Sequence, residues 1–302
     1  MGRYAARLVT PPQDEEIHPY RRVWASIAIE SGVLFALCTG VFVGFNLIGI
    51  SVPTVLEQGL RIVLVLLPFF LWVIFSLWRE QRVPLPRVRL FAVMIITVLA
   101  ANALGVPIVD LVFQPDRWLP LAPVPTRIVA YAITIGTLQE FIKYMVVRYT
   151  VWRDFFRTRL DSVAYTFASA VGYATVLNVQ FVLTTPTASP DAVALYVFET
   201  MALGAAASIV VAYGMAELRF ATPSPLFLPL TLIIASFLYG GLIPIRVNFV
   251  NASFSLAGGF PKPLIGLMLS FGVLIVISFV FSFLFERSER AAQEAEAAEG
   301  RA

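Results

Sequence analysis

Four ionisable side chains lie inside long apolar runs of this sequence. They are Glu30, Glu140, Lys143 and Glu199. At the middle of a lipid bilayer each would cost about 2.5–3.5 kcal/mol, so each needs a partner, a proton or a function. Carboxylates and an ammonium group could bind an ion or serve as general acid and base. We therefore take these four residues as the first candidates for chemistry.

Glu140 and Lys143 stand three residues apart, which places them on one face of a helix. An ion pair within that helix is the simpler interpretation, and a functional site with these two as catalytic candidates is the alternative. Glu30 and Glu199 have no partner nearby in the sequence, so each is protonated or pairs with a neighbouring helix. For Glu199 we favour a structural role or exposure to water. Glu30, Glu199 and the amide Asn178 are candidates for polar binding inside the membrane.

Histidine and cysteine are almost absent. The sequence contains one of each, His18 and Cys38. Because His18 lies in a polar N-terminal tail, no histidine is expected within the membrane for metal ligation or general-base catalysis. A single cysteine excludes a disulfide framework and a cysteine metal site. The aspartates nearest the membrane lie at the ends of apolar runs: Asp110, Asp116, Asp161 and Asp191. We expect neither a metal nor another cofactor.

The composition is that of a membrane protein. Hydrophobic residues make up 59% of the 302 positions and charged residues 14%, with a mean hydropathy of +0.82. Soluble domains carry charge at about 25% of positions. Eight apolar runs are long enough to cross a bilayer, which takes about 20 residues. They cover 23–50, 59–78, 90–113, 126–152, 162–185, 192–217, 226–245 and 263–285. The sequence predicts an all-α, polytopic bundle of about eight transmembrane helices.

Basic residues give the orientation of these helices. With the N-terminus inside, sixteen arginines fall on the cytoplasmic side and five basic residues outside, and Lys143 lies within the membrane. Because lysine and arginine accumulate in cytoplasmic loops, this bias predicts that both chain ends are cytoplasmic. The polar tail would be 1–22, the bundle 23–285 and a charged tail 286–302. The basic residues flank membrane spans, so they do not indicate nucleic-acid binding.

Small residues recur every four positions in three of the predicted spans. Such stripes let helix backbones approach closely in lipid. We favour packing within the chain over a dimer interface. The stripes are Gly32, Ala36, Gly40 and Gly44 in the first span, Ala164, Ala168 and Gly172 in the fifth, and Gly204, Ser208 and Ala212 in the sixth.

Several short motifs occur in a fixed order over about 130–245. They read Gln139-Glu140-Phe141-Ile142-Lys143, Leu160-Asp161-Ser162-Val163-Ala164-Tyr165, Gly172-Tyr173-Ala174-Thr175-Val176-Leu177-Asn178, Gly204 to Ser208 followed by Tyr213-Gly214, and Leu238-Tyr239-Gly240. This order resembles the PrsW family of bacterial intramembrane proteases, which are relatives of the CAAX-protease fold. The resemblance implies a helical membrane bundle with a site at the first, third, fourth and fifth motifs.

The departures from the family pattern fall on the residues that would perform catalysis. The family has glutamate where this chain has Gln139 and Leu177, and histidine where it has Gly204 and Tyr239. The amide of Gln139 and the phenol of Tyr239 are poor bases and poor metal ligands, and Leu177 and Gly204 offer no polar side chain at all. Together these four residues cannot activate water or hold a metal. The resemblance therefore implies a retained fold with an emptied active site, so we lean towards a protein that is not an enzyme.

Three functions follow from these observations. The first is a non-catalytic PrsW-like protein of the bacterial inner (plasma) membrane, acting as scaffold, assembly factor or accessory subunit with a membrane protein partner. The second is an active peptidase that uses Glu140 with a second carboxylate. The third is a transporter or lipid-binding protein in which Glu30, Glu140, Lys143 and Glu199 line one polar cavity. No inverted repeat supports the transporter.

Overall fold

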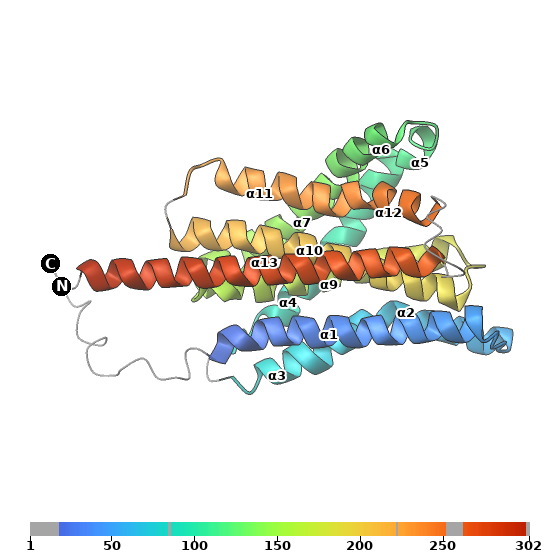
Figure 1. Cartoon of the computed structure of the whole chain (residues 1–302), viewed down its shortest axis with the longest axis horizontal. Helices are drawn as coiled ribbons and strands as arrows, with labels where there is room; N and C mark the ends of the chain where they lie inside the picture. Colours follow the sequence, from blue (N-terminus) through green and yellow to red (C-terminus); the bar gives the residue numbers. More distant parts are fainter. Residues whose placement is uncertain (1–17, 84–85, 222, 252–261, 300–302) are drawn as a thin grey trace.

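The computed structural model describes residues 18–83, 86–221, 223–251 and 262–299 (Figure 1). Every regular element in these ranges is helical. Most of the predicted polar tail lies outside the described residues, as do the last three positions of the predicted charged tail.

The first half of the described chain forms four long helical segments, some of which include π-helical turns. Their elements are α1 (His18–Phe42) with η2 (Val43–Leu47), α2 (Thr54–Trp72) with η3 (Val73–Leu77) and α3 (Trp78–Glu80), α4 (Leu90–Ala100) with η4 (Ala101–Gly105) and η5 (Ile108–Phe113), and, after the short α5 (Pro115–Trp118), α6 (Val124–Tyr131) with η6 (Ala132–Gly136), α7 (Thr137–Val147), η7 (Arg148–Trp152) and α8 (Arg153–Phe155).

The second half forms four more. Its elements are α9 (Arg159–Thr184), α10 (Pro190–Phe220), α11 (Phe227–Ser236) with η8 (Phe237–Gly241) and α12 (Leu242–Asn251), and α13 (Lys262–Glu299). The helical fold class is therefore confirmed.

Seven of these segments are long and apolar enough to cross a membrane within the described ranges. They are Val23–Leu47, Thr54–Glu80, Leu90–Phe113, Arg159–Thr184, Pro190–Phe220, Phe227–Val247 and Lys262–Glu294. They agree with seven of the eight predicted runs. The remaining run, 126–152, also forms a continuous helical segment from α6 to α8. Gln139, Glu140 and Lys143 lower its hydropathy, so it does not qualify on apolar composition.

The described ends lie together. The start of α1 and the end of α13 are both at the left of Figure 1, which requires an even number of crossings between them. The segment from α6 to α8 supplies the eighth crossing, because α6 contacts α12 at one end of the bundle and α7 continues along α9 and α11 towards the other.

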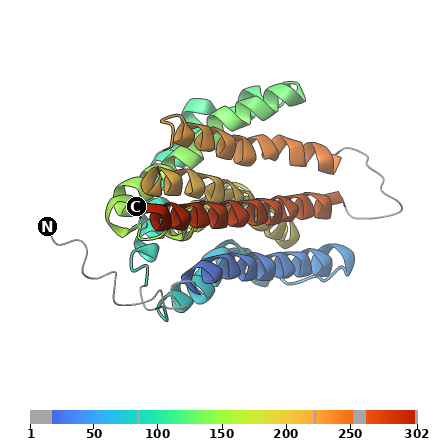
Figure 2. The same cartoon turned by 60° about the vertical axis from the view of Figure 1, so that its left-hand side comes forward.

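Helix α10 is the centre of the bundle. It contacts α9, α13, α11, α1 and α2. In Figures 1 and 2 the pair α1 and α2 lies on one side of it, and α11 and α12 lie on the other. Of the apolar window of α10, 89% is buried, against 33% for the helix of α1. The run of small residues from Gly204 to Ser208 explains this position, because small side chains allow several helices to approach one axis.

Glycines at two places bring helix backbones into contact. A Cβ on Gly136 of η6 would collide with the carbonyl of Ser236, and a Cβ on Gly240 of η8 would collide with the carbonyl of Tyr131. Gly214 is similarly close to Thr231. These contacts fix α10, α11–η8 and α6–α7 against one another.

The glycines of the first stripe differ. A Cβ on Gly32 or Gly40 of α1 would meet nothing within 4 Å, and Ala36 and Gly40 are exposed. In the described part of the chain this stripe is therefore not a close-packed contact, contrary to our expectation of packing within the chain. Of the four residues of this stripe only Gly44 is buried, and a Cβ built on it would stand 3.3 Å from Ile50 Cδ1.

Candidate functional site

Two π-helical turns position the motif residues. η6 ends at Gly136, three residues before Gln139 opens the first motif, and η8 contains Tyr239. Gly136 packs η6 against the end of α11, and Gly240 packs η8 against the end of α6. The side chains that follow these turns are therefore held at fixed positions beside α10. π-Turns of this kind occur frequently at functional sites.

Three of the motif positions meet at one point. Gly204 lies in α10, and a Cβ built on it would stand 3.7 Å from Gln139 Nε2 and 3.9 Å from Tyr239 Cε2. Gln139 is 2% exposed and Tyr239 4%. Residues from α7, α10 and η8 thus converge within the bundle. Resemblance to the family led us to group these positions, and in space they are neighbours.

Glu140 and Lys143 form the predicted ion pair. Lys143 Nζ lies 2.7 Å from Glu140 Oε1, and both side chains are almost completely buried. The ammonium group also donates to Ser208 Oγ at 2.8 Å and to the Gly204 carbonyl at 3.2 Å. Lys143 therefore joins α7 to α10 next to the point where the motif positions meet.

Several buried polar atoms of the motifs have no hydrogen-bond partner among the described residues. They are Gln139 Oε1, Glu140 Oε2 and both amide atoms of Asn178, whose side chain is 0% exposed. Leaving such a group unpaired costs about 1–3 kcal/mol. A core selected only for packing would replace these side chains with apolar ones.

Leu177 packs rather than reaching towards polar groups. It is partly buried against an apolar cluster that includes Ala101, Ile142 and Tyr173. The alkyl side chain supplies no proton acceptor, so this position adds only apolar contact to the site.

The other intramembrane carboxylates make no ion pair with Lys143 among the described residues. Glu199 pairs with Arg246 of α12 at 2.5 Å. Glu30 is 5% exposed, its Oε1 has no hydrogen-bond partner among the described residues, and no ion pair joins it to the other candidates there. Of the four ionisable residues, Glu140 and Lys143 thus pair with each other, Glu199 pairs with Arg246, and Glu30 has no ion pair among the described residues.

A second polar network holds the end of the bundle where α9 begins. Asp161 accepts hydrogen bonds from the backbone N–H groups of Arg157 and Thr158, both at 2.7 Å, and from Arg87 Nε at 2.6 Å. Arg87 also binds Glu80, with both carboxylate oxygens 3.0 Å from Nη1. Burial alone would lower the pKa of Arg87, but the charges of Asp161 and Glu80 raise it above its ordinary value. We call Glu80, Arg87 and Asp161 the Arg87 clasp, because the charged guanidinium of Arg87 ties the chain after α3 to the start of α9.

Comparison with protein families bears on four of the five motifs. Residues 86–211 match the model of the PrsW family intramembrane metalloprotease. The match extends from the Arg87 clasp through α4, α7 and α9 into α10, and it includes Gln139, Glu140, Lys143 and Gly204. The resemblance is confirmed over residues 86–211, whereas Leu238-Tyr239-Gly240 lies outside the match. No curated protein and no solved structure matches the chain significantly.

The donor set of this chain does not fit the metal that the family's description implies. No group of three or more His, Cys, Asp or Glu side chains suited to a metal ion occurs in the described ranges. At the meeting point the single carboxylate, Glu140, already binds an ammonium group at 2.7 Å. Zinc is held by imidazole, thiolate and carboxylate ligands, and a divalent cation here would also face the charge of Lys143.

Three partners were not identified from the sequence. Ser208 belongs to a small-residue stripe and to the fourth motif, but its bond to Lys143 was not expected. Arg246 is one of the five basic residues predicted outside, yet it pairs with Glu199. Arg87 is one of the sixteen arginines predicted on the cytoplasmic side, yet it also binds Asp161. The sequence carries no local signal for these contacts, because each joins residues of different helices.

Proposed function

We propose that this protein is a non-catalytic PrsW-like membrane protein that acts as a scaffold, assembly factor or accessory subunit of a membrane complex. The observation that carries the proposal is the Glu140–Lys143 pair at the meeting point of the motif positions. The one carboxylate there is neutralised by a neighbouring ammonium group. Gln139, Gly204 and Tyr239 supply no second general base beside it, so the activation of water would depend on a carboxylate that Lys143 already holds.

An outward-facing small-residue stripe supports an assembly role. Ala36 and Gly40 are exposed, and Gly32 and Gly40 have open space where a Cβ would stand. In lipid, such a stripe allows a second helix to approach closely. The emptied site and the open stripe together favour a protein that holds a partner over one that cleaves it.

We also propose the inner (plasma) membrane as its location, with both chain ends cytoplasmic. The bias of sixteen basic residues against five supports this orientation. Both described ends lie at the same end of the bundle, which is consistent with it (Figure 1).

The assembly role is tested by affinity purification of the tagged full chain from native membranes. We expect a stoichiometric membrane protein to co-purify, and Gly40→Leu to remove it by filling the stripe. The matched control is Gly59→Leu, because Gly59 of α2 is also exposed and has nothing near its Cβ position. Isolation of the unaltered chain as a lone monomer would contradict the role, as would equal loss of the partner in both variants.

An active peptidase that uses Glu140 is the second candidate. It is favoured by Glu140 Oε2, a buried acceptor without a hydrogen-bond partner among the described residues. The test compares protein termini in membranes from cells that carry the unaltered chain or Glu140→Gln. Under the non-catalytic proposal the two sets of termini are identical. Termini that disappear in Glu140→Gln, and that a Glu57→Gln control on α2 retains, would establish the peptidase instead.

A further inference from the structure

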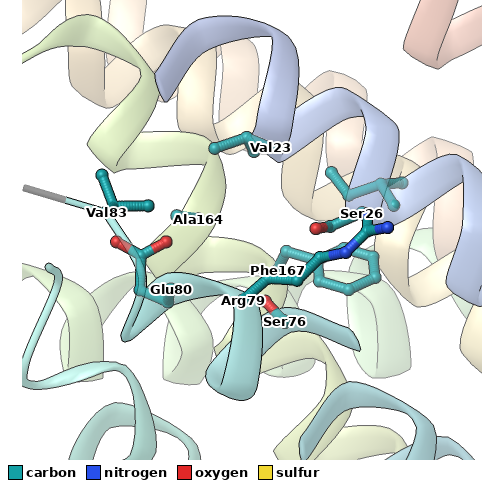
Figure 3. Close-up of a pocket in the computed structure, with 9 residues that line it drawn as sticks. Val23, Ser26, Ser76, Arg79, Glu80, Val83, Ala164 and Phe167 are labelled. Atoms are coloured by element: carbon teal, nitrogen blue, oxygen red, sulfur yellow. The ribbon is translucent and has the colours of Figure 1, made fainter. Parts of the chain in front are cut away.

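A mixed polar and apolar pocket lies between α1, α3 and α9, away from the PrsW motif positions that meet at Gly204 (Figure 3). It holds about 410 Å³ of empty space, counted out to its open mouth. Its apolar lining comes from Val23, Ile27, Val83, Ala164 and Phe167, and its polar lining from Ser26, Ser76, Arg79 and Glu80.

The charges of this pocket do not cancel. Glu80 is already bound by Arg87, whose Nη1 lies 3.0 Å from both carboxylate oxygens. Arg79 is exposed and takes part in no ion pair among the described residues. Figure 3 shows the Arg79 side chain reaching across the pocket to Ser26, while Glu80 points towards Val83. Glu30 lies one turn further along α1 and does not line the pocket, although the charge of Arg79 acts on it electrostatically. Among the residues that line the pocket, the charge without an ion pair is therefore positive.

The hydroxyl groups beside Arg79 can donate hydrogen bonds to an anion. Ser26 Oγ donates only a long bond of 3.5 Å, to the Phe75 carbonyl, and Ser76 stands on the turn before Arg79. A guanidinium group with two hydroxyls matches the oxygens of a phosphate group. The apolar wall of Ile27 and Phe167 suits the carbon chain that a phosphate ester carries.

The pocket includes the last residues of the candidate span Thr54–Glu80, where lipid headgroups are expected. Trp78 precedes Arg79, is 55% exposed and carries the guanidinium of Arg82 over its ring at 4.2 Å. Tryptophan and arginine in this arrangement are typical of the membrane–water interface. Basic pockets between transmembrane helices on the cytoplasmic side bind the headgroups of anionic lipids.

We infer that this pocket binds the phosphate group of an anionic membrane phospholipid, with Arg79, Ser26 and Ser76 on the phosphate and the wall of Ile27 and Phe167 on the glycerol backbone. The inference is independent of the proposed scaffold role, because it uses none of the motif residues. It holds whether or not the chain cleaves peptides.

The test uses the full chain in nanodiscs of phosphatidylcholine and phosphatidylglycerol, with retained lipids counted by native mass spectrometry after release. We expect phosphatidylglycerol to be retained over phosphatidylcholine. Arg79→Gln should weaken its apparent affinity about tenfold, because the charge-assisted bonds to the phosphate are lost. Ala164→Leu should weaken it too, by filling the pocket without changing charge.

Arg82→Gln is the matched control. It removes the same charge three residues after Arg79, and the Arg82 side chain does not line the pocket. The affinity of Arg82→Gln for phosphatidylglycerol should stay within roughly twofold of that of the unaltered chain, since Arg82 lies outside the pocket lining and its charge is screened by solvent. Equal loss in Arg82→Gln, or unchanged retention in Arg79→Gln, would overturn the inference. Displacement of phosphatidylglycerol by added sodium phosphate would show that free phosphate, rather than a lipid, is the ligand.

Discussion

The two sides of α10 use glycine in opposite ways. On the side of α11 and α6–α7, Gly136, Gly214 and Gly240 press against neighbouring backbone or side-chain atoms. On the side of α1, Gly32 and Gly40 have open space where a side chain would begin. The residue type is shared, but only the first set holds the chain to itself. A glycine on a helix therefore permits a close contact without indicating whose surface it meets.

The buried carboxylates differ in the same way. Glu140, on the packed side, has Lys143 at 2.7 Å, whereas Glu30 of α1 has no ion-pair partner among the described residues. The packed side thus neutralises its buried carboxylate within one chain, whereas the α1 side leaves open space beside its glycines and a carboxylate without an ion pair among the described residues. Changes on the packed side should cost more stability than changes on the α1 side.

The largest effect is expected for Lys143→Met. This change leaves Glu140 buried without its counter-charge and should lower the free energy of unfolding by about 3–5 kcal/mol. Adding Glu140→Gln should recover most of the loss, because no uncompensated charge then remains. Unfolding of purified protein in mixed micelles with increasing SDS measures both variants. Equal stability of the single and double variants would mean that the pair is not what holds α7 to α10.

A smaller effect is expected for Gly240→Ala. The added methyl group would collide with the Tyr131 carbonyl, and such overpacking costs about 1–3 kcal/mol. Gly40→Ala on α1 is the matched control and should change stability by less than about 0.5 kcal/mol. Thermal unfolding followed by circular dichroism compares the two. If Gly40→Ala were the more damaging variant, the contrast between the two sides would be wrong.

The smallest effect is expected for Glu30→Gln. Since Glu30 has no ion pair to lose among the described residues, an amide of the same shape should leave stability unchanged or raise it by up to about 1 kcal/mol. The same SDS titration measures it beside Lys143→Met. A loss comparable to that of Lys143→Met would reveal a strong partner for Glu30 and would remove the asymmetry between the sides.

Most of the helical architecture could be predicted from the sequence. Seven predicted runs match the helices that qualify as spans, because some 20 apolar residues in a row have few other folded uses. The eighth run is helical as well, although Glu140 and Lys143 weaken its apolar signal. The ion pair between these two residues was predictable because both lie on one helix, where spacing decides contact.

Contacts between helices were not predictable in this way. Arg246 and Glu199 come from different helices, and nothing in either local sequence indicates the other. Gln139, Gly204 and Tyr239 lie together in space, but before the structure only the resemblance to a family placed them in one group. The direction in which the α1 stripe faces depends on the rotation of α1 about its axis, which small-residue spacing leaves open.

The Arg87 clasp has a consequence for biosynthesis. Arg87 follows the second span, but its partner Asp161 is translated 74 residues later. Until the ribosome has passed that point, the guanidinium has only Glu80 to bind, and the connection between α3 and α4 lacks its anchor on α9. A chain interrupted before Asp161 would therefore enter the membrane with this charge half-neutralised. Proteolytic quality control could distinguish such a fragment from the finished protein by its loose connection.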